Sequence, residues 1–358
     1  MKKAKLGLIL GLAVVLVSVF VLPGPAAAKY VFRWGTADPG SYYYKASAFI
    51  SDFLRRGMPD YDLTIYPYVS TTANIKSYLV GELEAVYVAE PGFRDLYSFT
   101  KAYKGFEPNV KKMPVQCLWL YTMETHMLTL PENKEKYRTW DDLDGKKIFM
   151  TPAGYMNYLN MFRAMKDICG LNITHVEVDS SKVADALRAR TIDATAAYTT
   201  ALVSLASWIK MLDVATPLQG VNPTPEQIKK LTAAGFAPAK IDIKKAYTRD
   251  LGVDELYGVP FYFGQGLGLD IPEEAACKML QVLEESAGTL AKLEAGFGPL
   301  AKDFAGFQAL GIKSIPEVPV HPGLARYLKE KNLWDPAWII ADKETIKAAV
   351  EAMKAKAQ

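Results

Sequence analysis

Two long extended stretches constrain the fold of this chain more than any other feature of its sequence. They cover residues 113–130 and 256–269, are mostly apolar, and border a run of alternating strand and helix patterns. A chain that leaves one α/β series through an extended segment and returns through another is expected to form two lobes joined by two crossing strands. The predicted first lobe combines residues 29–123 with 271–358, and residues 124–270 form the second.

Three strand–loop–helix units open the first lobe. Apolar residues alternate before Gly35 and in residues 61–69, and residues 85–89 form a short apolar run, which predicts three strands. Small polar residues or a proline follow each strand, and Ser41 and Ser70 are placed to cap the first two helices. In an open α/β sheet, ligands bind at the carboxyl ends of the strands. These loops are therefore the predicted binding edge, and the N–H groups of the helix starts favour an anion there.

A second α/β series occupies the predicted second lobe. Its strands are expected at residues 146–150, 176–178 and 192–197, and its helices at residues 158–169, 181–190 and 200–209. The residues beyond Pro272 are mainly helical in pattern. Because the extended stretches separate the two series, each lobe is expected to have a sheet of its own.

The N-terminal segment has the pattern of a secretory signal peptide. Three lysines among the first five residues precede an apolar run over residues 6–22, a Pro-Gly-Pro break and three alanines at 26–28. We expect residues 1–28 to be removed and the mature protein to begin at Lys29 in the periplasm. A retained membrane anchor is the alternative, and the helix breakers before the alanines disfavour it.

The charge balance argues against a protein built to bind nucleic acid. The chain has 42 Lys and Arg against 39 Asp and Glu, and removing the three lysines of the signal peptide leaves equal numbers. No basic excess is then available to meet phosphates. Cys117, Cys169 and Cys277 are widely spaced and could form at most one disulfide, so free buried thiols are expected.

Three local motifs narrow the class of protein. They are residues 35–44, with their glycines and a Tyr-Tyr pair, residues 184–194, with Ala-Asp-Ala-Leu and Ile-Asp-Ala, and Val-His-Pro-Gly-Leu-Ala-Arg-Tyr at 320–327. In these motifs, their order and their spacing, the chain resembles the TAXI family of solute receptors for tripartite (TRAP) transporters. The resemblance implies a type II-like periplasmic binding protein with a ligand cleft between its lobes. Such a receptor closes on a small organic anion (a carboxylate, a dicarboxylate or an amino acid) and delivers it to TRAP membrane subunits. The resemblance further implies a monomer with no cofactor and no enzymatic activity.

Three loops depart from the pattern of that family. The first has Ala-Asp-Pro at 37–39 where relatives usually have more glycine, and the second has Ser-Thr-Thr at 70–72 in place of a glycine pair. The third has Glu90 where an uncharged polar residue is more usual. A carboxylate from Asp38 or Glu90 would repel an organic anion unless it turns away or meets an ammonium group. The identity of the ligand therefore stays open.

The predicted ligand contacts are hydroxyl, amide and phenol groups in the loops of both lobes. Several helix starts converge on one edge, each favouring an anion by about 0.3 to 1 kcal/mol, so a carboxylate could be held without a dedicated arginine. A group of tyrosines suggests aromatic walls with phenolic donors: Tyr42, Tyr43, Tyr44, Tyr87, Tyr155 and Tyr198. The leading candidates are Thr36, Ser41, Tyr43, Ser70, Thr72, Asn74, Tyr87, Thr151, Tyr155 and Tyr198.

Patterns for catalysis and metal binding are absent from the sequence. His126, His175 and His321 lack metal-ligand spacing, so structural roles are expected for all three, with His321 at a helix start. There is no nucleophile elbow, no phosphate-binding loop with Gly-Lys-Ser/Thr and no His-Glu-x-x-His motif. Arg94 and Arg163 are possible carboxylate partners, although their positions on helices favour exposed surface.

Two alternative functions remain open. The same two-lobed fold could serve an ABC importer or a sensor kinase, and nothing in the chain distinguishes these from a TRAP receptor. A secreted hydrolase would need Asp38 and Glu90 to converge on one substrate bond as an acid and a base.

Overall fold

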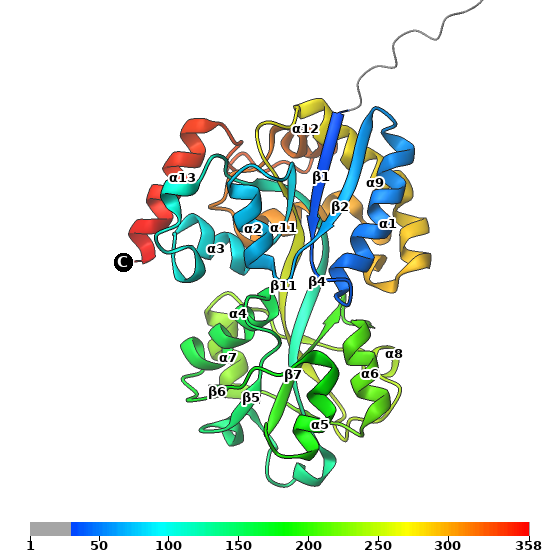
Figure 1. The fold of residues 1–358 in the computed structure, drawn as a ribbon, viewed down its shortest axis with the longest axis vertical. Helices are drawn as coiled ribbons and strands as arrows, with labels where there is room; N and C mark the ends of the chain where they lie inside the picture. The colour runs from blue at the N-terminus through cyan, green and yellow to red at the C-terminus, as the bar shows by residue number, and fades with distance from the viewer. Residues whose placement is uncertain (1–29, 358) are drawn as a thin grey trace, which may run out of the picture.

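The computed structural model describes residues 30–357, so the predicted signal peptide and the start at Lys29 lie outside the described residues. The described chain forms two lobes, one above the other in Figure 1, linked by strands β4 (Val115–Thr129) and β11 (Tyr257–Leu267). Segments from both ends of the chain build the upper lobe, and the middle of the chain builds the lower one (Figure 1). The predicted α/β fold of two lobes with two crossing strands is confirmed. The boundaries at 123/124 and 270/271 stay predictions.

The first lobe begins with the three predicted strand–loop–helix units. Strands β1 and β2 run parallel, with Trp34 opposite Ile65, and β3 joins the other edge of β1. Ser41 and Ser70 cap their helices as predicted, accepting hydrogen bonds from the backbone N–H groups of Tyr44 and Ala73. The elements are β1 (Tyr30–Thr36), α1 (Tyr42–Gly57), β2 (Tyr61–Pro67), α2 (Thr71–Leu79), β3 (Ala85–Ala89) and α3 (Glu90–Tyr97), followed by 3₁₀ turns at Lys101–Tyr103 and Glu107–Asn109.

The second lobe is built from shorter elements. Between the two crossing strands the chain forms β5 (Lys147–Phe149), α4 (Met156–Phe162), a π-helix (Arg163–Ile168), β6 (Thr174–His175), α5 (Val183–Arg188), β7 (Ala194–Thr200), β8 (Ser204–Leu205), α6 (Ser207–Ala215), β9 (Gln219–Val221), α7 (Pro225–Ala233), β10 (Ala239–Lys240) and α8 (Ile243–Ala246). Short 3₁₀ turns lie at Pro131–Asn133, Trp140–Leu143 and Ser180–Lys182.

The strands form one hydrogen-bonded path rather than the two separate sheets expected. The order is β2-β1-β3-β11-β4-β7-β5-β6, with β11 paired to β3 on one side and to β4 on the other. The expectation of separate sheets is wrong because β4 has 15 residues, long enough to pair with β11 along most of its length and with β7 and β9 near its end. The lobes are thus two ends of one sheet that share their crossing strands.

Two predicted elements of the second lobe are also wrong. The helix expected at 200–209 starts only at Ser207, because antiparallel pairing with β4 extends β7 to Thr200, opposite Met123, and a turn then leads into β8. The strand expected at 176–178 lies instead at Thr174–His175. It pairs with only two residues of β5, Lys147 and Ile148, so the ladder ends at His175.

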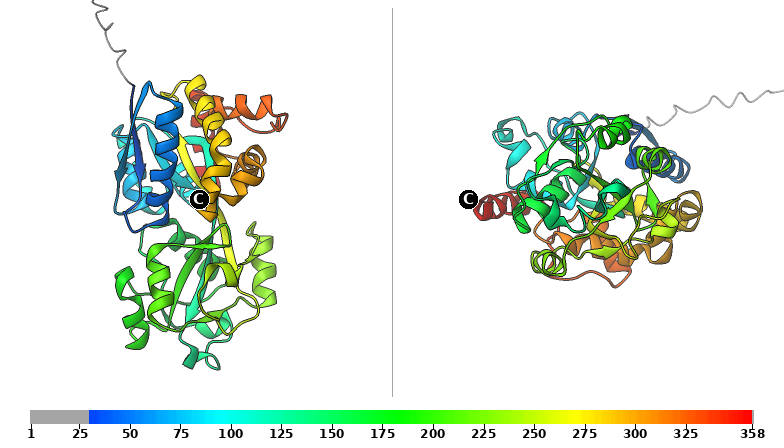
Figure 2. Two further views of the ribbon diagram at one scale, coloured as in Figure 1. Left: turned by 90° about the vertical axis from the view of Figure 1, so that its right-hand side faces the viewer. Right: turned by 90° about the horizontal axis from the view of Figure 1, so that it is seen from below.

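The C-terminal part is helical, as predicted. Its elements are α9 (Glu273–Leu293), a 3₁₀ turn at Ala295–Phe297, α10 (Gly298–Lys302), α11 (Phe304–Ser314), α12 (Pro322–Glu330) and α13 (Lys343–Ala357). Helix α9 lies alongside α1, as Figures 1 and 2 show, and α13 packs near α3. Across residues 30–357, none of the helices has the length and apolar character needed to cross a membrane.

Candidate ligand-binding site

A small aromatic cavity lies where the two lobes meet. It measures about 10 Å³, which is room for a single water. Side chains of the first lobe, of the second lobe and of both crossing strands contribute to its wall. The lining residues are Ala37, Ser41, Tyr42, Tyr43, Thr71, Tyr87, Met123, Tyr155, Met156, Asn157, Tyr198 and Phe263.

Stacked aromatic rings form the wall of the cavity on the side of the first lobe. The rings of Tyr43 and Tyr87 are stacked with centroids 4.3 Å apart, and Phe263 stacks on Tyr87 at 5.1 Å. Tyr121 continues the stack beside Phe263 at 5.7 Å. The order of Tyr87, Phe263 and Tyr121 follows from the sheet, because their strands β3, β11 and β4 are neighbours, and Tyr43 of α1 stacks on Tyr87. The amide of Gln265 is hydrogen-bonded to the hydroxyl of Tyr43, which fixes that phenol.

Loops of the second lobe close the cavity from the other side. The hydroxyl of Tyr155 donates a hydrogen bond to Oδ2 of Asp38 at 3.1 Å, across the boundary between the lobes. The other carboxylate oxygen of Asp38 accepts from the N–H of Gly40 at 2.6 Å, which holds the loop before α1. The start of α1 and the start of α4 are therefore joined directly by one hydrogen bond.

A second polar contact joins the lobes behind the cavity. Glu294 is buried and accepts a hydrogen bond from the hydroxyl of Ser204 at 2.5 Å, while its other oxygen is paired with Lys45. Burial acts to raise the pKa of Glu294, but the hydrogen bonds from Lys45 and Ser204 outweigh it, so the pKa lies below its ordinary value. The carboxylate is thus held ionised between a cation of the first lobe and a hydroxyl of the second.

The phenols of the cavity are donors at neutral pH. Burial raises the pKa of Tyr155, and the negative charge of nearby Asp38 adds to the effect. Burial also raises the pKa of Tyr43, Tyr87 and Tyr198 well above the usual range for tyrosine. The wall therefore presents neutral O–H groups and aromatic faces.

Five of the ten predicted contact residues meet at this cavity. Ser41, Tyr43 and Tyr87 come from the first lobe and Tyr155 and Tyr198 from the second, although members of the two groups lie 68 to 157 positions apart in the chain. Their common location agrees with the predicted edge. As ligand contacts, all ten candidates stay predictions.

The other five candidates do not line the cavity. Ser70 caps α2, and both Ser70 and Thr72 lie against Gly154 of the second lobe, where an added Cβ would sit 3.2 Å from the Cβ of Ser70. Asn74 is buried, and its side-chain oxygen accepts from the N–H of Tyr87 at 3.2 Å. Thr36 and Thr151 are fully buried, and Thr151 has a φ of 71°.

Several lining residues were not among the leading candidates. Tyr42 was expected only as a possible aromatic wall. Phe263 and Met123 lie on the crossing strands β11 and β4. The sequence does not show which face of these strands is turned toward the cavity, so it could not single out these two side chains. The remaining additions are Ala37, Thr71, Met156 and Asn157, each adjacent to a predicted residue or loop.

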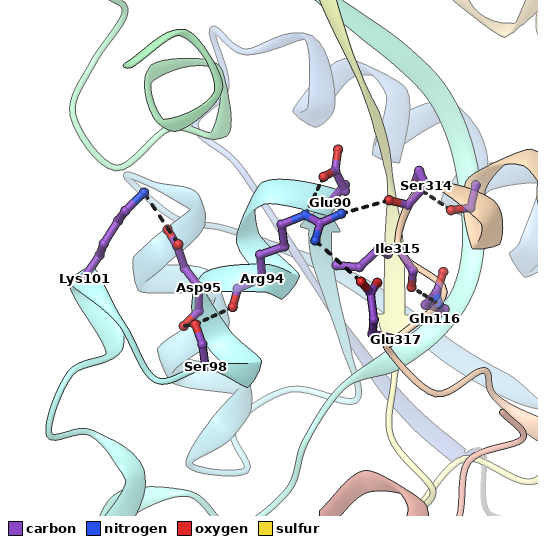
Figure 3. Close-up of polar contacts among 10 residues, drawn as sticks. Glu90, Arg94, Asp95, Ser98, Lys101, Gln116, Ser314, Ile315 and Glu317 are labelled. Carbon is purple, nitrogen blue, oxygen red and sulfur yellow. Dashed lines mark hydrogen bonds and ion pairs between the residues drawn. The ribbon is translucent and has the colours of Figure 1, made fainter. Parts of the chain in front are cut away.

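Glu90 does not face the cavity as an isolated charge. Its Oε1 accepts a hydrogen bond from Nε of Arg94 at 2.7 Å (Figure 3). Arg94 also donates to the backbone oxygen of Ser314 at 3.2 Å and lies 3.9 Å from Glu317. The reading of Arg94 as exposed surface is wrong in part, because its side chain is only 34% exposed. The guanidinium instead neutralises Glu90 within the first lobe.

A second cavity lies at the outer rim of the cleft, between α3 and α4. It measures about 160 Å³ and is lined by Pro91, Arg94, Asp95, Lys101, Leu159, Arg163 and Asp167. Arg163 is half-buried, with its guanidinium 5.0 Å from the ring centre of Phe236. Asp95 has a pKa raised by burial and lies 3.6 Å from Lys101 (Figure 3). Three basic side chains (Arg94, Lys101 and Arg163) and two acidic ones (Asp95 and Asp167) line this cavity, so its wall has one positive charge in excess.

The histidines and cysteines make structural contacts. His126 is buried between the hydroxyl of Tyr247 at 2.5 Å and the backbone oxygen of Glu124 at 3.0 Å. His321 caps α12 as predicted, accepting from the N–H of Gly323. All three cysteines are free thiols, two of them buried. Within residues 30–357, no group of three or more His, Cys, Asp or Glu side chains is arranged to hold a metal ion.

Comparisons with known proteins give weak likenesses. No protein-family model and no curated protein sequence matches this chain. The chain is similar in structure to the periplasmic aliphatic sulphonate binding protein SsuA from Escherichia coli, with 11% identity over 91% of this chain and 87% of that one and a TM-score of 0.46. It is similar to the alkanesulfonate-binding protein SsuA from Xanthomonas axonopodis pv. citri bound to MOPS, with 16% identity over 90% and 91% of the two chains and a TM-score of 0.40. It is also similar to the GluR0 ligand-binding core in complex with L-glutamate, with 12% identity over 75% and 97% of the chains and a TM-score of 0.42. At such low identities and TM-scores, these likenesses do not bear on what this chain does.

Proposed function

We propose that this protein is an extracytoplasmic solute receptor that holds one small organic molecule between its two lobes. The observation that carries the proposal is the cavity walled by Tyr43 and Tyr87 of the first lobe and by Tyr155 and Tyr198 of the second. A site shared by two lobes couples ligand binding to lobe closure, because a ligand that contacts both lobes binds the closed arrangement better. This coupling is what a receptor needs in order to signal its loaded state to a membrane partner.

The transporter class and ligand class rest on the sequence resemblance. We propose a TAXI-type receptor that works as a monomer in the periplasm, after loss of the signal peptide, and delivers its ligand to TRAP membrane subunits. The ligand implied is a small organic acid: a carboxylate, a dicarboxylate or an amino acid. A binding protein of an ABC importer or a sensor kinase is the alternative with the same fold.

A hydrolytic function is less well supported by the geometry. The pair that it would need, Asp38 and Glu90, is engaged separately: Asp38 with Tyr155 and Gly40, and Glu90 with Arg94. Neither carboxylate is poised beside the other on one open substrate site. We therefore propose a receptor rather than an enzyme.

Mass spectrometry of small molecules released from the denatured, purified protein tests the proposal. We expect one organic molecule at close to one equivalent, and calorimetry with the same compound should then give saturable binding to ligand-free protein. Tyr198→Phe in the second lobe and Tyr43→Phe in the first should both weaken that binding. Turnover of the compound during the titration, or binding that neither substitution alters, would contradict the proposed role of the site.

A further inference from the structure

We propose, on the basis of the receptor function above, that the group recognised in the aromatic cavity is an organic ammonium, so that the ligand carries a positively charged nitrogen. The inference concerns the chemistry of the wall. A carboxylate or dicarboxylate without such a nitrogen would find no counter-charge in it.

The charges around the cavity are negative. Among the described residues that line it there is no Lys, Arg or His, and the lining side chain of Tyr155 is hydrogen-bonded to the carboxylate of Asp38. Arg94, which could have supplied a cation, is instead paired with Glu90, and Lys45 is paired with Glu294. Burying a carboxylate without a partner is costly, so an anion would be disfavoured at this wall.

The aromatic rings favour a cation for a second, independent reason. Six of the twelve lining residues are aromatic, and they approach from both lobes: Tyr42, Tyr43, Tyr87 and Phe263 on one side, Tyr155 and Tyr198 on the other. The faces of such rings attract ammonium groups, and several rings around one cation are a common means of binding alkylated nitrogen. A negative carboxylate beside the rings adds to the attraction.

The hydrogen bond between Tyr155 and Asp38 indicates how such a ligand would enter. The cavity has room for about one water, so the lobes must part before a ligand can occupy it. When the lobes separate, the hydrogen bond from the Tyr155 hydroxyl to Oδ2 of Asp38 is broken. A ligand ammonium would take over this carboxylate oxygen, exchanging an O–H donor for a full positive charge.

Calorimetry with ligand-free protein and simple probes tests the inference. Tetramethylammonium, choline and glycine betaine present a quaternary nitrogen, glycine and methylamine present a primary one, and succinate and acetate present carboxylates alone. We expect binding of the quaternary compounds, of the primary amines or of both, and no binding of succinate or acetate. Asp38→Asn should weaken ammonium binding about tenfold or more, because the half-buried carboxylate that meets the ammonium is lost. Asp52→Asn, on the exposed end of α1, is the matched control and should have no effect.

Tyr155→Phe separates this inference from the general receptor function. It removes the donor that competes for Asp38, so ammonium binding should strengthen or stay the same, whereas a ligand anion that used the Tyr155 hydroxyl would bind more weakly. Binding of succinate or acetate in place of the ammonium probes, with loss in Tyr155→Phe, would overturn the ammonium inference while the receptor function stands. If no probe binds and no small molecule is released on denaturation, both are overturned. Circular dichroism of each variant shows that it is folded.

Discussion

At the scale of single residues, close approaches fix which side chains the site can contain. Gly35 is the residue before the last one of β1, and an added Cβ there would lie 2.0 Å from Nδ2 of Asn74 and 2.6 Å from Cδ1 of Leu83. Both neighbours are buried, and Asn74 in turn holds the backbone of Tyr87. The absence of a side chain at Gly35 therefore helps to set the position of a cavity residue on the neighbouring strand.

Gly35→Ala is expected to destabilise the protein by about 1 to 3 kcal/mol, because two buried side chains must move to admit one methyl group. The matched control is Gly288→Ala. Gly288 lies in α9 with no atom near its potential Cβ, so alanine there should stabilise the helix by about 0.5 to 1 kcal/mol. Urea unfolding of both variants measures the two changes. Equal effects of the two substitutions would show that the close approach at Gly35 is not a constraint.

The buried histidines predict a loss of stability in acid. Burial lowers the pKa of His126 and of His321 to about 4, below the value of about 6.5 expected in the unfolded chain. The unfolded state therefore binds more protons between these values, and each histidine should cost on the order of 3 kcal/mol as the pH falls from about 6.5 to about 4. Glu124, with a pKa raised by burial, acts in the opposite direction.

His126→Gln isolates one of these contributions. Its free energy of unfolding should fall less steeply between pH 6.5 and pH 4.5 than that of the unsubstituted protein. Tyr247→Phe removes the hydrogen bond to His126 but keeps the imidazole, so it should lower stability and retain the steep pH dependence. Denaturant titrations at a series of pH values measure both slopes. A slope unchanged by His126→Gln would contradict the assignment.

At the scale of elements, helix starts have two possible roles that the sequence could not separate. Ser70 was expected to contact the ligand, whereas its hydroxyl oxygen accepts from the N–H of Ala73 at 3.2 Å and its residue lies against Gly154 rather than in the cavity wall. Ser41, by contrast, has both roles, since it caps α1 and also lines the cavity. One sequence signal, a serine before a helix, thus corresponds to two different environments.

Ser70→Ala is expected to cost about 1 kcal/mol of stability through loss of the cap, with ligand affinity changed less than twofold. Ser70→Asp keeps a capping acceptor and should restore most of the stability. Thermal unfolding and calorimetry on the same samples measure the two quantities. A large loss of affinity in Ser70→Ala, without a loss of stability, would assign Ser70 to the ligand instead.

At the scale of the whole molecule, two polar contacts join lobes that share only two crossing strands. One is Tyr155 to Asp38 at the cavity, and the other is Ser204 to Glu294 behind it. Because Glu294 is also paired with Lys45, the second contact connects β8 of one lobe with α1 and α9 of the other. The balance between open and closed arrangements should therefore depend on both contacts.

Ser204→Ala is expected to shift the ligand-free protein toward the open arrangement about tenfold or more, since a hydrogen bond to a charged group contributes about 1.5 to 3 kcal/mol. Small-angle X-ray scattering should show a larger radius of gyration for the variant. Ser286→Ala removes a hydroxyl that bonds only within α9, to the backbone oxygen of Val282, and serves as control. The same radius for Ser204→Ala and the unsubstituted protein would exclude this contact as a closing element.

The sequence alone predicted the features that depend on local chemistry. Alternating apolar residues predicted β1 and β2, apolar runs predicted β3 and the two crossing strands, and serine before a helical pattern predicted the caps of α1 and α2. Helix caps, turns and side-chain periodicity depend on residues only a few positions apart. They can therefore be recognised in the sequence without knowledge of the fold.

Tertiary structure decided what depends on residues distant in the chain. Pairing with β4 extended β7 into the expected helix and merged two sheets into one. Folding also brought Tyr155 onto Asp38, placed Arg94 against the backbone of Ser314 and placed only part of the polar loops in the cavity wall. Each of these contacts depends on the position of a partner dozens to more than two hundred residues away. Local sequence determined the elements of this protein, and long-range packing determined which of their side chains share the site.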